Sequence, residues 1–113
     1  MYVFKEPKEI SFEKAGIKGK IFPIDNLTKK IQYFLVETDK GHETTIIEHD
    51  CDFIYYILEG KGYFKINNVK EACEKGNLVV IPADLPFTYK GKLKMMVTST
   101  PPWKEEQEET LRS

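Results

Sequence analysis

Short runs of β-branched and aromatic residues alternate along this chain with turns rich in Gly, Asn, Asp and Lys. The runs span residues 19–24, 29–38, 43–49, 53–60, 61–67, 77–83 and 92–100. Runs of this length and composition, bounded by turn residues, are typical of β-strands. The pattern predicts an all-β domain of antiparallel strands, and a double-sheet roll of about eight strands would remove most exposed strand edges.

The two ends of the chain depart from this pattern. Residues 1–16 predict an arm or an edge strand, with a single helical turn over 11–16 as one reading. Pro101 and Pro102 should end the last strand, because proline cannot donate to a strand ladder. Trp103 is expected to dock on the barrel, and residues 104–113 predict a charged tail that is mobile or forms a short helix.

Length and charge narrow the class of protein. The 113 residues, 41% of them hydrophobic, can bury one core, so we expect a single domain over 1–113. With 17 basic and 18 acidic side chains, the chain lacks the positive field that attracts nucleic acid or anionic membrane. The N-terminus has no signal-peptide pattern and no apolar run is long enough to span a membrane. We expect a cytoplasmic protein, with Cys51 and Cys73 as reduced thiols.

Residues 41–60 carry spaced positions of functional interest. Gly41, Ile47, His49, Phe53 and Gly60 occupy the intervals of a motif that reads Gly, five residues, His, one, His, three, Glu, six, Gly. The two glycines and His49 match this motif. Ile47 stands at the first His position and Phe53 at the Glu position.

A second spaced pattern follows in residues 76–87. Gly76 and Pro82 match the start of a motif that reads Gly, five residues, Pro, one, Gly, two, His. Asp84 stands at its second Gly, and Phe87 stands at its His.

Together the two patterns resemble the paired motifs of the cupin superfamily. The resemblance covers residues 41–89 and implies a double-stranded β-helix, the cupin jelly-roll barrel. It also implies a cluster of three His and one Glu around a metal ion, of which this chain supplies His49 alone. N-terminal arms of small cupins often take part in dimers, so the resemblance further implies a homodimer.

A single imidazole does not hold Fe, Mn, Ni or Zn, which need three or more protein ligands of suitable geometry. We therefore predict no family-type metal centre and no cofactor. His42, Glu43, Cys51 and the neighbouring acidic residues leave open a rebuilt metal site with His49.

Strand alternation assigns side chains to faces. Thr45, Ile47 and His49 share one face of their strand, and the cupin register turns that face inward. The same register turns aromatic side chains inward from the other motif strands, which predicts an apolar, aromatic pocket. The expected ligand-binding residues are Tyr33, Thr45, Ile47, His49, Phe53, Tyr55, Phe87 and Tyr89.

His49 is the candidate for chemistry. It is either a buried histidine held by tyrosine hydroxyls or a general acid/base, because imidazole titrates near neutral pH. Metal-free enzymes of the superfamily pair a His with a Tyr, which makes Tyr55 or Tyr89 the expected partner. We expect a small-molecule binding or sensing protein. The alternatives are a metal-independent carbohydrate isomerase or epimerase that uses His49, and a metal-dependent enzyme with a rebuilt site.

Overall fold

The computed structural model describes residues 1–104 and 108–111, and these residues form nine strands. No helix occurs among them, and therefore none that is long and apolar enough to cross a membrane. The strands are β1 Phe12–Lys14, β2 Ile17–Ile21, β3 Gln32–Thr38, β4 Thr45–Glu48, β5 Asp52–Ile66, β6 Val69–Glu74, β7 Leu78–Ile81, β8 Phe87–Thr100 and β9 Glu108–Leu111. The prediction of an all-β double-stranded β-helix is confirmed.

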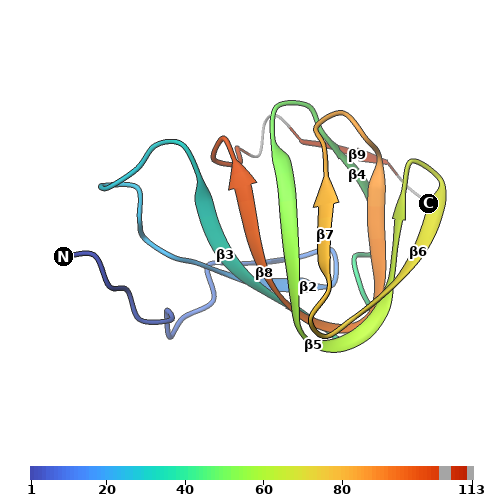
Figure 1. Cartoon of the computed structure of the whole chain (residues 1–113), viewed down its shortest axis with the longest axis horizontal. Coiled ribbons are helices and arrows are strands. Elements are labelled where there is room, and N and C mark those ends of the chain that lie inside the picture. Colours follow the sequence, from blue (N-terminus) through green and yellow to red (C-terminus); the bar gives the residue numbers. More distant parts are fainter. Residues whose placement is uncertain (105–107, 112–113) are drawn as a thin grey trace.

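Two long strands, β5 and β8, hold the barrel together (Figure 1). They pair antiparallel from Asp52↔Thr100 to Ile66↔Phe87, with a register shift between Ile57 and Glu59. The first half of β5 and the second half of β8 belong to one sheet, together with β1, β2, β3 and β7. The second half of β5 and the first half of β8 belong to the facing sheet, together with β4, β6 and β9.

The strands can bend between the two sheets because glycines lie where the β8 backbone leaves no room for a β5 side chain. A Cβ on Gly60 or Gly62 would collide with the β8 backbone at Lys92 or Lys90. Gly60 also has a positive φ of 93°, which favours glycine. The bend turns both halves of β5 toward one interior.

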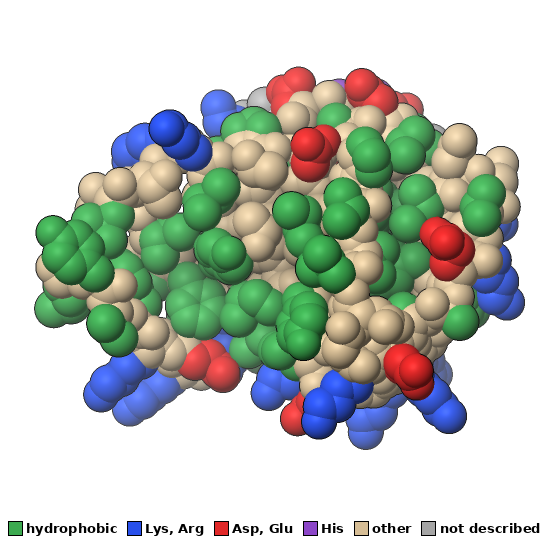
Figure 2. Space-filling view, viewed as in Figure 1, with side chains coloured by type: hydrophobic (Ala, Val, Ile, Leu, Met, Phe, Trp, Pro, Cys, Tyr) green, Lys and Arg blue, Asp and Glu red, His purple; other side chains and the backbone are tan. Residues whose placement is uncertain are grey.

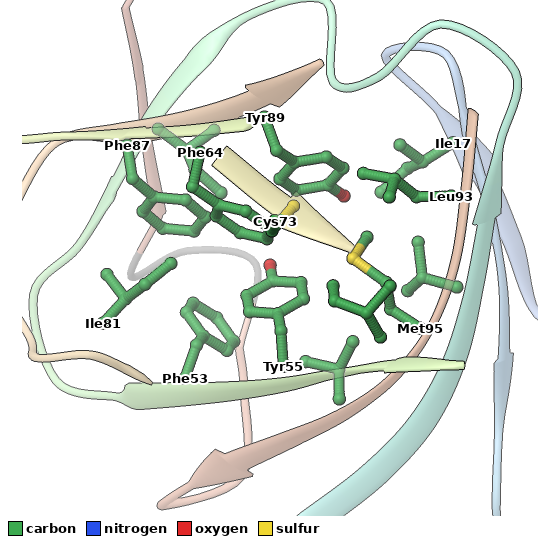
Figure 3. Close-up of a cluster of buried hydrophobic side chains, with 14 of the residues drawn as sticks. Ile17, Phe53, Tyr55, Phe64, Cys73, Ile81, Phe87, Tyr89, Leu93 and Met95 are labelled. Carbon is green, nitrogen blue, oxygen red and sulfur yellow. The ribbon is translucent and has the colours of Figure 1, made fainter. Parts of the chain in front are cut away.

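Aromatic side chains from both sheets fill that interior (Figure 3). Their ring centroids lie 5.0 to 6.2 Å apart, and most pairs are tilted or edge-to-face. Such pairs add about 0.5–1.5 kcal/mol each beyond the burial of apolar area. The cluster consists of Phe53, Tyr55, Phe64, Phe87 and Tyr89, all nearly inaccessible to solvent. Four of these five were expected to face inward.

The facing of β4 is the reverse of the prediction. Ile46 and Glu48 are buried, whereas Thr45 and Ile47 are half-buried and His49 is exposed. A slip of one residue moves every side chain of a strand to its other face.

The slip starts at Gly41, whose φ is 109° and whose missing Cβ lets it lie against Tyr89 and Lys90 of β8. The next two amides are also anchored, since His42 N–H donates to Tyr89 O and Glu43 N–H donates to Ala15 O, both at 2.8 Å. In the motif, five residues separate the first glycine from the first inward position. Here four residues, 42–45, separate Gly41 from Ile46, the first inward residue of β4.

The chain ends match expectation in part. Phe12–Lys14 is an edge strand on β2, one of the forms expected for residues 1–16, whereas the alternative helical turn over 11–16 does not form. Within the expected charged tail, Glu108–Leu111 is strand β9, which pairs with β4. Residues 105–107 and 112–113 of that tail lie outside the described residues. Trp103 packs against the core, as expected.

Apolar side chains also gather on the outer face of β5 and β7 (Figure 2). Tyr56, Leu78 and Val80 are exposed there, and Tyr56 pairs with Leu78 across the two strands. This face offers the apolar surface that a homodimer requires. The oligomeric state itself remains a prediction.

Candidate functional site

A cavity of about 40 Å³ lies inside the barrel. Its apolar side is formed mainly by Phe12, Ile21, Phe34, Ile46, Phe53 and Trp103. Its polar side chains are Lys14, Gln32, His42, Tyr55, Tyr89 and Glu108. Hydrophobic walls with a few convergent polar groups are typical of small-molecule sites.

Larger hollows occur on the surface, including one of about 570 Å³ lined by Lys61, Lys92 and Glu59. These three side chains are exposed. Solvated charges of this kind contribute little binding energy. The interior cavity is the better candidate because its His42, Tyr55 and Tyr89 side chains are shielded from water.

Tyr55 and Tyr89 reach the cavity from opposite sheets. Tyr55 lies on the first half of β5 and Tyr89 on the first half of β8, with ring centroids 5.6 Å apart. Figure 3 shows both hydroxyl groups in the barrel interior. Burial raises the pKa of both phenols, and each hydroxyl lies close enough to perturb the pKa of the other. Both remain protonated near neutral pH and can donate hydrogen bonds.

His42 comes from the loop between β3 and β4, beside Tyr89. Its ring packs edge-on against Tyr89 with centroids 5.6 Å apart. The His42 backbone is tied to β8, since its N–H donates to Tyr89 O and its carbonyl accepts from the Thr88 hydroxyl at 3.1 Å. The imidazole is therefore held in place although it lies outside a strand.

The tautomer of His42 follows from its hydrogen bonds. Nδ1 lies 2.8 Å from the carbonyl oxygen of Thr44, which can only accept, so Nδ1 carries the proton. The contact from Thr44 N–H to Nδ1 is longer, 3.3 Å, and does not change this assignment. Nε2 is left as the acceptor. Burial lowers the pKa of His42, so near neutral pH the ring is uncharged and Nε2 is a free base.

One side of the cavity is covered by three side chains that contact one another. Trp103 Nε1–H donates to Glu108 Oε2 at 2.8 Å. Lys14 Nζ lies 3.4 Å from Glu108 Oε1 and 4.5 Å from the centre of the Trp103 ring. We call Lys14, Trp103 and Glu108 the cover.

Beyond the cover, a surface hollow of about 270 Å³ is lined by Ala15, Thr44 and Thr110. Lys14, His42 and Glu108 line both the hollow and the cavity. His42 therefore lies between the interior and a route to solvent.

The predicted site residues divide into two groups. Phe53, Tyr55 and Tyr89 line the cavity, and Phe87 is buried beside them in the core. Tyr33 is exposed. Thr45, Ile47 and His49 lie on the outer side of β4 because of the slip described above.

The inward placement expected for His49 is wrong. Its side chain is 50% exposed and sits between two carboxylates, with Nδ1 at 2.8 Å from Asp84 and Nε2 at 3.0 Å from Glu109. The hydrogen bonds that His49 donates to Asp84 and to Glu109 raise its pKa, with Asp84 the larger cause. His49 links β4 to β9 at the surface, and the cavity histidine is His42.

The sequence reasoning considered His42 only as a metal ligand. Its one signal was its position next to Gly41, a glycine that the motif placed against the neighbouring strand. Glu108 had no comparable signal, because its place depends on the pairing of β9 with β4.

Within 1–104 and 108–111, no group of three or more His, Cys, Asp or Glu side chains is placed to hold a metal ion. Cys51 and Cys73 are both buried and free, and burial raises the pKa of Cys51 to about 12.

Comparison with known proteins places this geometry among related chains. No family model matches the sequence. The uncharacterized protein MJ1618 of Methanocaldococcus jannaschii is 32% identical over 93 residues, which cover 76% of this chain and 74% of MJ1618. An RmlC-like cupin from Shewanella frigidimarina superposes with a TM-score of 0.69 at 17% identity, over 87% of this chain and 86% of its own.

PAC13 of Streptomyces, described as a nucleoside dehydratase, superposes with a TM-score of 0.89 at 21% identity, over 99% of this chain and 92% of PAC13. PAC13 has been solved with uridine in three variants, H42Q, Y55F and Y89F. The same residue types stand at the same numbers here, as His42, Tyr55 and Tyr89.

Proposed function

We propose that this chain, which belongs to the same family as MJ1618 of M. jannaschii and has the cupin fold, is a nucleoside-binding enzyme that eliminates water from its substrate. In this proposal His42 is the general base, and Tyr55 and Tyr89 donate hydrogen bonds to the substrate.

The observation that carries the proposal is the convergence of His42, Tyr55 and Tyr89 on one cavity. Fold likeness alone would not support an activity, since one barrel hosts many unrelated chemistries. The same three residue types are substituted in PAC13 structures that hold uridine. The family relative MJ1618 is uncharacterized and contributes no activity to the argument.

The proposed reaction is a β-elimination. His42 Nε2 takes a proton from a carbon of the substrate, the C–H electron pair forms a carbon–carbon double bond, and the C–O bond to the neighbouring hydroxyl breaks. The departing hydroxide takes a proton from the imidazolium and leaves as water, which restores neutral His42. A histidine is basic enough for this step where a carbonyl next to the C–H bond stabilises the negative charge.

The two tyrosines suit the step in which the C–O bond breaks. Their raised pKa values keep both hydroxyls protonated, so they can donate hydrogen bonds to the negative charge that develops on oxygen. Such donors are most effective in a site that excludes water, and this cavity is buried. Removing one donor of this kind typically lowers turnover by about 10²–10³-fold.

Binding requires the cavity to enlarge. Small-molecule sites usually have volumes of about 300–1,000 Å³, whereas the cavity measures about 40 Å³ and the adjoining hollow about 270 Å³. Moving the cover of Lys14, Trp103 and Glu108 would join these two spaces. A part-buried ion pair, one hydrogen bond and the packing of Trp103 against the core hold the cover, so moving it costs a few kcal/mol, which binding of a ligand can offset.

A small-molecule binding or sensing protein, the first expectation from the sequence, would use the same cavity but would not convert its ligand. A neutral histidine with a free Nε2 beside two buried phenols favours the enzyme. Turnover separates the two proposals, because a binding module leaves its ligand unchanged.

Uridine binding to the purified protein is the first test, measured by isothermal titration calorimetry. Wild type should bind uridine, and His42→Gln, Tyr55→Phe and Tyr89→Phe should each lower turnover. Uridine binding should persist in these variants, because the PAC13 variants with the same substitutions were solved with uridine. Tyr56→Phe is the matched control, because Tyr56 is the neighbour of Tyr55 that faces solvent. Loss of one water is then sought by mass spectrometry in a panel of nucleosides and nucleoside aldehydes. Absence of uridine binding at millimolar concentration would overturn the proposal.

Metal analysis of the untagged protein addresses the remaining alternative, metal-dependent chemistry at a rebuilt site. One metal ion per chain, lost together with activity on chelation, would favour that alternative. Activity that is unchanged by chelation would favour proton transfer by His42.

A further inference from the structure

The geometry points to Gln32 as the residue that selects the ligand, by accepting a hydrogen bond from an N–H group on a planar heterocycle. This inference rests on the proposed nucleoside site and names the part of the nucleoside that is recognised.

Gln32 begins β3 and faces the barrel interior. Phe34 and Val36, the alternate residues along the strand, are buried in the core. Gln32 lines the cavity, and its Oε1 atom is inaccessible to solvent. Throughout the described part of the chain, no donor pairs with this oxygen. A buried acceptor without a partner is unfavourable, because it has lost water and gained nothing in return.

The neighbouring polar groups already have partners. Ser99 lies opposite Gln32 on β8, and its hydroxyl oxygen accepts from the Trp103 backbone N–H at 3.0 Å. Glu108 accepts from both Trp103 and Lys14. Gln32 Oε1 is thus the acceptor that this end of the cavity leaves for a ligand.

The walls beside Gln32 suit a flat ring. Phe12 and Phe34 pack edge-to-face with centroids 6.1 Å apart, and Ile21, Phe53 and Trp103 complete the apolar lining. Aromatic and aliphatic walls favour a planar ring, and one polar group at the edge of such a slot sets the orientation of the ring.

Among the other polar groups, Tyr89 and Glu108 belong to the opposite sheet and His42 to the loop that leads into it. His42 is anchored to β8 at Tyr89, on the half of that strand that pairs with β4. A ligand that reaches both Gln32 and His42 therefore needs a planar ring with an N–H donor and a hydroxylated part that can react. The imide N3–H of a uracil base and the sugar of the same nucleoside meet this description.

Binding of two probes, uridine and 3-methyluridine, tests the inference by calorimetry. The methyl group removes the N3–H donor and leaves the sugar intact. Wild type should bind 3-methyluridine about 10-fold more weakly or worse, the usual effect of leaving a buried acceptor unpaired. In Gln32→Ala both probes should bind weakly and almost equally. Gln32→Glu, which keeps an acceptor, should retain a preference for uridine.

Glu37→Ala is the matched control, because Glu37 lies on the same strand and faces solvent. It should leave both affinities unchanged. Equal binding of the two probes to wild type would overturn the inference and leave the proposed function standing. A preference for uridine that persists in Gln32→Ala would also overturn it, since N3–H would then be read elsewhere. Absence of uridine binding would remove both proposals. If Gln32→Ala does not fold, the nearly isosteric Gln32→Glu carries the test, and loss of its preference for uridine would overturn the inference.

Discussion

Tyr55 and Tyr89 face each other across the barrel with ring centroids 5.6 Å apart, one from each sheet, and burial raises the pKa of both. Because both residues are almost fully buried, water cannot take the place of either hydroxyl as the partner of the other. We therefore expect the pair to act as one unit in stability and in chemistry.

Removing either hydroxyl should remove an interaction of the other hydroxyl as well. We expect Tyr55→Phe and Tyr89→Phe each to lower the free energy of unfolding by about 1 kcal/mol, the usual net value of a buried hydrogen bond. The double variant should lose less than the sum, because both single variants break the same interaction. Urea denaturation of the four proteins measures this, and strictly additive losses would show that the hydroxyls act independently.

The pH dependence of activity should report His42. Burial lowers its pKa, so the imidazole becomes a competent base at a pH below the 6.5 of an unperturbed histidine. Turnover, or uridine affinity if turnover is slow, should rise with pH through a midpoint below 6.5. The stability linked to His42 has the matching sign: it is present above the unfolded-state pKa and is lost as pH falls below it, because the unfolded chain then binds more protons. A midpoint above 6.5 would contradict this assignment.

The two histidines should titrate on opposite sides of the unperturbed value. His49 is held between Asp84 and Glu109, which raise its pKa, whereas burial lowers that of His42. The contribution of His49 to stability is therefore present below its unfolded-state pKa and is lost as pH rises through its higher folded-state value. Proton NMR of the two imidazoles gives both midpoints, and His49→Gln assigns the signals. His49→Gln should also leave uridine affinity unchanged, and a large loss would return His49 to the site.

The cover should control access to the cavity. Trp103 is half-buried against the core, so Trp103→Ala should destabilise the protein by about 1–2 kcal/mol through lost apolar burial. The same change should speed uridine association, since the cavity would then open to the hollow beside His42. Stopped-flow measurements on wild type and Trp103→Ala test this. An unchanged association rate would mean that the ligand enters elsewhere.

Glu108→Gln is a milder change to the cover. It keeps an acceptor for Trp103 Nε1–H but removes the charge that pairs with Lys14. We expect stability to change by less than about 1 kcal/mol, since the ion pair is partly exposed at Lys14. The negative charge of Glu108 also acts to raise the pKa of His42, so its removal should shift the pH midpoint downward. A midpoint that does not move would show that the charge of Glu108 does not affect the pKa of His42.

Several features follow from local pattern and were predictable. Alternation within β5 and β8 was enough to turn Phe53, Tyr55, Phe87 and Tyr89 inward, because a strand has two faces and the apolar one is buried. The glycines at 41 and 60 also kept their motif positions, since each lies where a side chain would collide with β8. The cupin fold and two members of the candidate site come from these signals.

The register of β4 could not be read in the same way. Counting from Gly41 gave His49 as an inward residue, yet backbone hydrogen bonds to Tyr89 and Ala15 anchor the intervening loop and shorten the count by one. Loops carry no periodicity, so no pattern reveals such a shift, and a single residue exchanges the two faces of the strand.

The sequence by itself determined the class of fold, the single core and the inward aromatic residues, because these depend on hydrophobic periodicity along each strand. Only the tertiary structure decided which histidine meets the tyrosines, which acceptor stays unpaired at Gln32, and that Trp103 and Glu108 cover the cavity. These features join residues far apart in the chain, and their positions depend on strand pairing and on backbone hydrogen bonds that short-range pattern does not encode.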